Sequence, residues 1–320
     1  MRIDLGKNIR AGAHYTQFFV ADFDCDGKAE MTCKTADGTV DGKGKVIGDA
    51  SKDYRNSSGY VLSGSEYYTL FDGSTGAALD TVNYEPSRGT VSKWGDSYGN
   101  RVDRFWGTVA YLDGSKPSVV TGRGYYTRMT ATAYDVVNKK LVKRWAFDTG
   151  NNKSVAGYGD GNHNSMAADV DGDGKQEIIT GSTCIDDNGK VLWCLNKGHG
   201  DAMHLATFSP TARGWNCGSA TKTNPTAFRW WTLPTARSSS TRTVPATPDA
   251  AVQTMSGQAT REQNSGDWGT MSLTAAATPS AAADRQSTFC PTGTAIWNGR
   301  FWTATPTPLP PFPKWEQTAS

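Results

Sequence analysis

Short apolar runs alternate with polar turns along the first two thirds of the chain. Four of these runs, Phe18–Val20, Ala29–Cys33, Ser165–Ala168 and Ile178–Thr180, flank two acidic loops. Short apolar runs bounded by Gly, Asp and Asn are typical of strands, and no helical period of comparable strength accompanies them. The pattern therefore predicts short strands joined by tight turns.

Hairpins are predicted between the acidic loops and after the second one. Three segments combine two apolar runs with a turn of Asp, Asn or Gly, namely residues 69–80, 133–145 and 185–193. Those residue types supply the positive φ angles of tight hairpin turns. A degenerate loop-and-strand unit occurs at Ala110–Gly114 and Ser118–Thr121. Repetition of such units predicts an all-β chain that forms a partial β-propeller over residues 1–205.

The two acidic loops have the same arrangement of nine residues. Alternate carboxylates, a Gly that permits a sharp turn and a further Glu make an oxygen cage suited to Ca²⁺. The Glu stands at the ninth place, whereas a helix-loop-helix calcium loop carries it about three residues later. The candidate ligands are Asp22, Asp24, Asp26 and Glu30 in the first loop and Asp169, Asp171, Asp173 and Glu177 in the second. We expect each loop to be a calcium-bound connection between strands with a structural role.

The histidines suggest a second kind of site. His163 lies in a Gly-Asn-His-Asn segment, and His199, Asp201 and His204 lie in and after a Gly-His-Gly-Asp segment. His199 and Asp201 project to one side if that stretch is extended. Two interpretations are open, namely packed or solvated histidines, and imidazoles that bind a metal or carry a proton beside an orienting carboxylate.

Charge and hydropathy exclude some classes of function. The net charge of the 320 residues is +2, and the basic residues form no run, so we expect no nucleic-acid partner. No segment approaches the roughly 20 apolar residues of a membrane span, so we expect no membrane partner. Residues 1–7 lack the apolar core of a signal peptide, so the sequence as given predicts no export.

Composition changes abruptly after Leu205. Twelve of the fourteen prolines follow it, and Asp-Gly turns stop. One interpretation of residues 206–320 is a low-complexity linker. The other is a tail translated out of frame, because one base restored near codon 205 lets permissible codons spell Asp-Gly turns and apolar alternation again. We favour the shifted frame and expect an irregular, largely unstructured tail, and the nucleotide sequence distinguishes the two origins.

Several long motifs resemble one enzyme family. They are Lys7–Gln17, Lys34–Gly42, Arg88–Phe105, Arg123–Arg128, Gly161–Asn164 and Gly198–Asp201. Together they resemble the rhamnogalacturonan lyases of polysaccharide lyase family 11. The resemblance implies a calcium-containing, eight-bladed β-propeller, expected to be secreted. It also implies β-elimination at rhamnose–galacturonate linkages of rhamnogalacturonan I, an acidic plant cell-wall polysaccharide of pectin.

The resemblance also assigns roles to residues. It implies that His163, His199 and Asp201 hold a catalytic Ca²⁺ or transfer protons, together with a Glu that exists here only in the second reading frame. Basic and aromatic residues are assigned to substrate or, alternatively, to packing between blades: Arg88, Arg104, Arg123, Tyr125 and Arg128. Family members carry a small β-sandwich domain and further blades, so we expect this chain by itself to be inactive.

A different class of function uses similar loops. Integrin-type propellers carry acidic calcium loops and catalyse nothing, which makes a calcium-dependent carbohydrate- or protein-binding module the alternative. A purely structural calcium propeller has no need of paired imidazoles. The constellation of His163, His199 and Asp201 therefore discriminates between the two functions.

Overall fold

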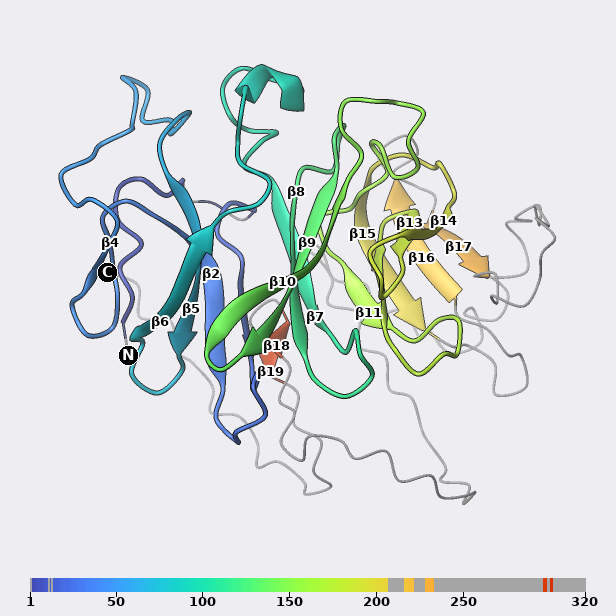
Figure 1. Ribbon diagram of the computed structural model, residues 1–320. Coiled ribbons are helices and arrows are strands. Elements are labelled where there is room, and N and C mark those ends of the chain that lie inside the picture. Colours follow the sequence, from blue (N-terminus) through green and yellow to red (C-terminus); the bar gives the residue numbers. More distant parts are fainter. Residues whose placement is uncertain are drawn as a thin grey trace, which may run out of the picture.

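The computed structural model describes residues 2–10, 12 and 14–206, and beyond them only short strands (Figure 1). Apart from the 3₁₀ turn η1 (Val91–Trp94), every element among these residues is a strand. The predicted all-β class is confirmed. None of the described elements is a helix with the length and apolarity needed to cross a membrane.

The first sheet contains the first acidic loop. Its strands are β1 (Phe18–Ala21), β2 (Glu30–Ala36), β5 (Glu66–Asp72) and β6 (Ala78–Asn83). They pair antiparallel in the order β1-β2-β5-β6, and the loop joins β1 to β2. A small hairpin of β3 (Thr39–Val40) and β4 (Val46–Ile47) is inserted between β2 and β5. The strands predicted around the loop and the hairpin predicted over residues 69–80 are confirmed.

The second and third sheets are also four-stranded and antiparallel. The second contains β7 (Phe105–Ala110), β8 (Ser118–Arg123), β9 (Thr130–Val137) and β10 (Lys140–Asp148). The third contains β11 (Met166–Ala168), β12 (Glu177–Thr180), β13 (Thr183–Ile185) and β14 (Val191–Cys194). The second acidic loop joins β11 to β12, as predicted. Edge strand β10 carries exposed Lys and Arg side chains, which disfavour pairing with another chain.

A further sheet begins where the predicted tail begins. It contains β15 (Gly200–Ala206), β16 (Asn216–Thr221) and β17 (Phe228–Thr232). β16 and β17 lie in the region expected to be irregular, yet β16 pairs with β15 and β17 pairs with β16. Two more short strands, β18 (Ile296–Trp297) and β19 (Arg300–Phe301), form a hairpin. The rest of the tail, and with it the predicted shift of frame, lies outside the described residues.

Three apolar cores lie between consecutive sheets, and a fourth packs Ile47 of the β3–β4 hairpin against Cys33 and Phe71 of the first sheet. The first core joins Tyr68 and Leu70 of the first sheet to Val119 of the second, and the second core joins Trp106 to Ile178 of the third. A third core packs the third sheet against β15. Burying a side chain of this size stabilises a fold by roughly 1.5–3 kcal/mol, so the sheets are held together mainly through their faces. Figure 1 shows them side by side in chain order.

The acidic loops and the turn after β7 lie at one end of the sheets. Ala21 pairs with Glu30 in the first sheet, Ala110 with Ser118 in the second, and Ala168 with Glu177 in the third. The turns that follow β1, β7 and β11 share one end, because the first two line one pocket and the N–H of Gln176 donates to the carbonyl of Tyr111 at 3.0 Å. The segments that precede these strands share the opposite end, which is where the histidines lie.

Candidate metal centre

Residues that precede the first strands of different sheets converge on one place. His163 lies just before β11, His199 lies immediately before β15, and Asp201 is the second residue of β15. Each of these strands begins at the same end of its sheet, so the side chains meet although the chain separates them. The rings of His163 and His199 lie 4.8 Å apart, edge to face.

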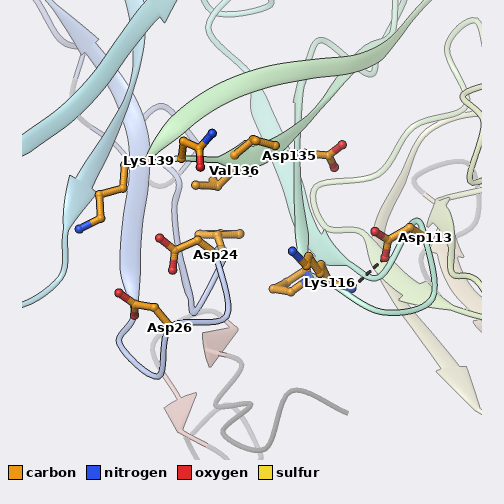
Figure 2. Close-up of a pocket in the computed structure, with 11 residues that line it drawn as sticks. Asp24, Asp26, Asp113, Lys116, Asp135, Val136 and Lys139 are labelled. Carbon is orange, nitrogen blue, oxygen red and sulfur yellow. Dashed lines mark hydrogen bonds between the residues drawn. The ribbon is translucent and has the colours of Figure 1, made fainter. Parts of the chain in front are cut away.

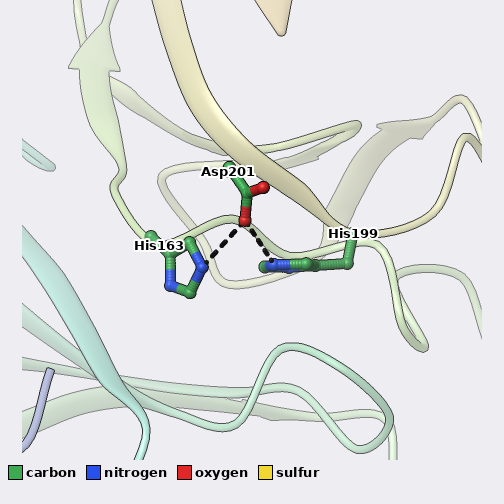
Figure 3. A group of neighbouring side chains, drawn as sticks. All are labelled: His163, His199 and Asp201. Atoms are coloured by element: carbon green, nitrogen blue, oxygen red, sulfur yellow. Dashed lines mark hydrogen bonds and ion pairs between the residues drawn. The ribbon is translucent and has the colours of Figure 1, made fainter. Parts of the chain in front are cut away.

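The Asp201 carboxylate lies between the two imidazoles (Figure 3). Its Oδ1 is 3.0 Å from Nε2 of His163 and 3.4 Å from Nε2 of His199. One ligand atom from each of the three residues lies within 4.8 Å of the others. Two imidazole nitrogens and a carboxylate at this spacing can converge on one divalent cation.

The second nitrogen of His199 determines its tautomer. Nδ1 lies 2.8 Å from the carbonyl oxygen of Gly161, which can only accept a hydrogen bond. Nδ1 therefore carries the proton, and in the neutral ring Nε2 presents its lone pair toward Asp201. A hydrogen bond of this kind behind the ligating nitrogen is the usual way in which proteins orient a metal-binding imidazole.

His163 is oriented by the hydroxyl of Tyr125. Its Nδ1 lies 2.8 Å from the Tyr125 hydroxyl, which can donate or accept. The pair therefore accommodates either tautomer of His163, including the one that offers Nε2 to a cation. Burial raises the pKa of Tyr125 above its ordinary value, so the phenol keeps its proton. Tyr125, which the sequence analysis assigned to substrate binding, therefore contacts the histidine centre directly.

His14 was missed by the sequence analysis, which grouped His204 with the other two histidines. The His14 ring stacks on His163 with centroids 4.3 Å apart and an interplanar angle of 25°. It precedes β1 just as His163 precedes β11, so the position relative to a predicted first strand is the signal that finds it. His204 is exposed on β15.

The two acidic loops share hydrogen bonds as well as their residue pattern, although the N–H of Asp173 donates to Asp171 where that of Asp26 donates to Asp22. In the first, the Asp22 carboxylate accepts the N–H groups of Asp26 and Gly27 at 3.0 Å, and Glu30 accepts that of Phe23. In the second, Asp169, Gly174 and Glu177 occupy the equivalent places. Gly27 and Gly174 have φ angles of 88° and 92°, a region that favours glycine.

Two clusters of carboxylates result from these loops. One contains Asp22, Asp24 and Glu30, and the other contains Asp169, Asp171 and Glu177. The remaining predicted ligands, Asp26 and Asp173, are outside these clusters and accept the backbone N–H groups of Lys28 and Lys175. Each loop thus brings together three of its four predicted ligands.

The carboxylates of both clusters have the properties expected of cation ligands. Burial and repulsion from neighbouring carboxylates raise the pKa of Glu177 to about 8, although the N–H of Val170 opposes the shift. The same causes raise the pKa of Glu30 to about 7. Asp24 Oδ1 and Glu177 Oε1 are buried without a hydrogen-bond partner among the described residues. A hard cation would supply the missing partner.

The degenerate loop lies next to the first acidic loop. The Asp113 carboxylate accepts the N–H groups of Ser115 and Lys116 at 2.8 Å, as a simple turn does. This turn, the first acidic loop and the β9–β10 hairpin line a pocket at the end of the sheets opposite His163 (Figure 2). The pocket is therefore separate from the histidine centre.

Arg88 and Arg123, two residues assigned to substrate, are buried between the first two sheets. Both guanidinium groups contact Oε1 of Glu66, at 2.9 and 2.5 Å, and Lys34 approaches the same atom at 3.2 Å. Burial acts to raise the pKa of Glu66, but its three cationic neighbours outweigh it and lower that pKa below its ordinary value. In this structure both arginines pack between sheets, which is the alternative to substrate binding that the sequence left open.

The other two arginines assigned to substrate are more accessible. Arg128 forms an ion pair with Asp148 and lies over the Trp94 ring at 4.4 Å. Arg104 lies over Tyr15 at 5.3 Å and donates to the side chain of Asn100. The assignment of these side chains to substrate stays a prediction.

Comparison with known proteins identifies the family. The C-terminal domain of rhamnogalacturonan lyase family 11 matches residues 1–264. The chain belongs to this family. Over 213 residues the family member described here is 57% identical to the rhamnogalacturonan exolyase YesX and 58% identical to the rhamnogalacturonan endolyase YesW, both of Bacillus subtilis strain 168. The alignments cover 67% of this chain but only 35% and 34% of those proteins.

Solved structures agree with this placement in family 11. The rhamnogalacturonan lyase PL11 of Bacillus licheniformis matches with a TM-score of 0.67 and 59% identity, over 68% of this chain and 38% of that one. The structure of the exotype lyase YesX matches with the same TM-score and 55% identity, over 68% of this chain and 36% of that one. This family 11 chain thus spans about a third of the length of its relatives.

Proposed function

We propose that this chain supplies one wall of the active site of a rhamnogalacturonan lyase, which cleaves rhamnogalacturonan I by β-elimination. The observation that carries the proposal is the convergence of His163, His199 and Asp201 at the starts of different sheets. A non-catalytic calcium module needs no such centre, and the two curated relatives are both lyases. The alternative of an integrin-like binding module is therefore not favoured.

We further propose that the sheets are blades of a β-propeller. Consecutive four-stranded antiparallel sheets follow one another along the chain, and each is joined to the next by a core between their faces. This radial repetition is how propellers are built. Each described sheet is open, with an edge strand on either side. Residues at the starts of first strands would then line the central end of the ring.

The cation proposed for both kinds of site is Ca²⁺. At the acidic loops every ligand is an oxygen, which suits Ca²⁺ and a structural role. Of the three residues at the histidine centre only Asp201 contributes oxygen, so the remaining ligands of Ca²⁺ there would be oxygen atoms of water, of substrate or of other residues. When bound there, the ion would stabilise negative charge that develops on a uronate carboxylate during proton removal.

The chain's own residues prepare this centre for the reaction. The Gly161 carbonyl and the Tyr125 hydroxyl hold the two imidazoles so that both Nε2 atoms face Asp201. The buried rings of Tyr125 and its neighbours exclude water from one side and so strengthen local electrostatic interactions. In β-elimination a base removes the proton next to the carboxylate while the O4 substituent leaves, and a positioned base contributes about 10²–10⁴-fold to such a step.

The similarity carries no preference for one mode of cleavage. The aligned region is 57% identical to an exolyase and 58% identical to an endolyase. It therefore holds features that are common to both modes. We propose that those features are the metal centre and the uronate-binding groups around it.

A chimera tests the proposed function without depending on the rest of this chain. The region of YesW that aligns with it is replaced by the corresponding residues of this chain. We expect the chimera to release ultraviolet-absorbing unsaturated products from rhamnogalacturonan I in the presence of Ca²⁺. The double change His163→Ala and His199→Ala should reduce the rate by at least about 10²-fold.

The control for this experiment is the exposed His204 on β15. His204→Ala should leave the rate of the chimera unchanged. A folded chimera with intact histidines and no activity would contradict the proposed function, as would full activity without His163 and His199. The expectation that this chain alone is inactive is checked by the same assay on the purified chain.

A further inference from the structure

Within residues 2–206, two arginines lack the acidic partner that the other seven have. Within residues 2–206, seven of the nine arginines have a carboxylate oxygen within 4.0 Å: Arg2, Arg10, Arg55, Arg88, Arg123, Arg128 and Arg144. Arg101 and Arg104 have none in this part of the chain. Both lie in the turn that leads into β7.

One of these guanidinium groups stacks on an aromatic ring beside the metal centre, and the other lies near the same ring. Arg101 lies 3.8 Å from the centroid of Tyr126, and Arg104 lies 6.0 Å from it. The Tyr126 ring lies in turn 4.2 Å from that of His199 and 6.0 Å from that of His163. The two positive charges therefore border the place where the cation ligands converge.

Hydrogen bonds within the turn that contains Arg101 and Arg104 fix its backbone. The Asp96 carboxylate accepts the backbone N–H groups of Gly99 at 2.9 Å and Arg101 at 2.8 Å. The Asn100 side-chain oxygen accepts from Arg104 Nη2 at 2.8 Å and from the Tyr15 hydroxyl at 2.7 Å. A ligand thus meets guanidinium groups whose backbone is already in place, which lowers the entropic cost of binding.

Part of the hydrogen-bonding capacity of these side chains is unused. Arg104 Nε is buried and has no hydrogen-bond partner in the described residues, and leaving such a donor unpaired is unfavourable. A guanidinium presents a planar fork of donors that matches a carboxylate with two parallel hydrogen bonds. The arrangement is complementary to an anion that enters beside the tyrosine ring.

We propose that Arg101 and Arg104, with Tyr126 beneath them, form a subsite that binds the carboxylate of a uronate residue next to the metal centre. The identity of the sugar rests on the proposed function, but recognition of the carboxylate does not depend on a bound metal. These two arginines would determine that the polysaccharide bound here is acidic rather than neutral. They are specificity-determining residues for this end of the sheets.

Calorimetric titration of the purified chain with trigalacturonate tests the subsite. The comparison ligand is the carboxyl-reduced, neutral trisaccharide, and both are titrated in EDTA and in Ca²⁺. In EDTA we expect the acidic ligand to bind at least about tenfold more tightly than the neutral one. The double change Arg101→Gln and Arg104→Gln should remove this difference.

Two further variants separate recognition from folding. Arg55→Gln, which removes an exposed arginine paired with Asp53, should leave the preference for the acidic ligand unchanged. Arg101→Lys with Arg104→Lys keeps the charge without the fork, so part of the preference and a similar melting temperature should remain. Equal affinity for both ligands, an unchanged preference in the Gln variant, or no binding of trigalacturonate would each overturn the proposal.

Two sets of variants distinguish a failure of this proposal from a failure of the proposed function. If loss of His163 and His199 leaves the chimera's cleavage intact while the Arg101 and Arg104 variant loses uronate binding, the metal centre is wrong and the subsite stands. If the histidine variants lose activity but the arginine variant binds trigalacturonate normally, the proposed function stands and the subsite is wrong.

Discussion

Glu66 shows, at the scale of single residues, how a buried charge is satisfied by partners from distant parts of the chain. Lys34 comes from the same sheet, Arg88 from the connection after β6, and Arg123 from the second sheet. Three cations around one buried carboxylate tie the first two sheets together at the end where the histidines lie. Removing one member of a buried ionic group leaves the others uncompensated.

We therefore expect Glu66→Gln to lower the free energy of unfolding by about 3–5 kcal/mol. The measurement is urea unfolding of the chain at neutral pH, with intact and variant protein side by side. Glu85→Gln is the matched control, because Glu85 pairs with Lys143 on the surface. An exposed pair contributes at most about 1 kcal/mol, so equal effects of the two changes would contradict this account of the inter-sheet contact.

The sequence predicted correctly which residues lie together when those residues are close in one motif. His199 and Asp201 stand two residues apart and do lie in the same cluster. His14 could be found only through its position before a strand, because its contact with His163 depends on how two sheets pack. The burial of Arg123 against Glu66 likewise arises from a pairing between sheets, which local sequence patterns do not contain.

At the scale of elements, the acidic loops act as strand connections whose charge is unbalanced. The Asp-Gly pattern, the ninth-place Glu and the apolar flanks predicted both loops and the four strands around them, and the structure confirms these strands. They were predictable because ligand spacing and strand alternation are local. The hairpins at residues 133–145 and 185–193 were predictable for the same reason.

Calcium-free protein should become less stable as pH rises from about 5 to 8. The pKa of Glu177 is raised from 4.5 to about 8 and that of Glu30 to about 7, so the folded state holds protons that the unfolded chain releases. Folding therefore binds protons in this window, and the free energy of unfolding falls as pH rises through it. Urea unfolding in EDTA at several pH values measures this slope.

Calcium and one substitution provide the controls for the pH dependence. Saturating Ca²⁺ should replace the protons and abolish the decline, and Glu177→Gln should weaken it in EDTA because the amide does not titrate. Glu85→Gln should leave it unchanged. Stability in EDTA that is constant or rises between pH 5 and 8 would show that the loop carboxylates are not held close together without calcium.

At the scale of the whole molecule, the two ends of the sheets have different chemistry. One end carries the acidic loops and the turn at Asp113, and the other carries the histidine centre with Arg101 and Arg104 beside it. This division follows from the way consecutive sheets pack face to face, with their first strands starting at the same end.

The all-β class was predictable from the sequence, but the sideways packing of the sheets was not. Strand alternation defines which residues face a core, whereas the partner sheet depends on which faces meet, as Trp106 meets Ile178. The resemblance to family 11 supplied the idea of blades in a ring. In the region expected to be irregular, the aromatic run Phe228–Thr232 forms β17 and extends the array.

Calcium titration of the purified chain by calorimetry tests the central claim most directly, namely that His163, His199 and Asp201 hold a cation separately from the two acidic loops. The account predicts uptake of three ions by the intact chain and by His204→Ala, one for each loop and one for the histidine centre. With His163→Ala and His199→Ala it predicts two. The same number of ions bound with and without these histidines, or no uptake of calcium at all, would contradict it.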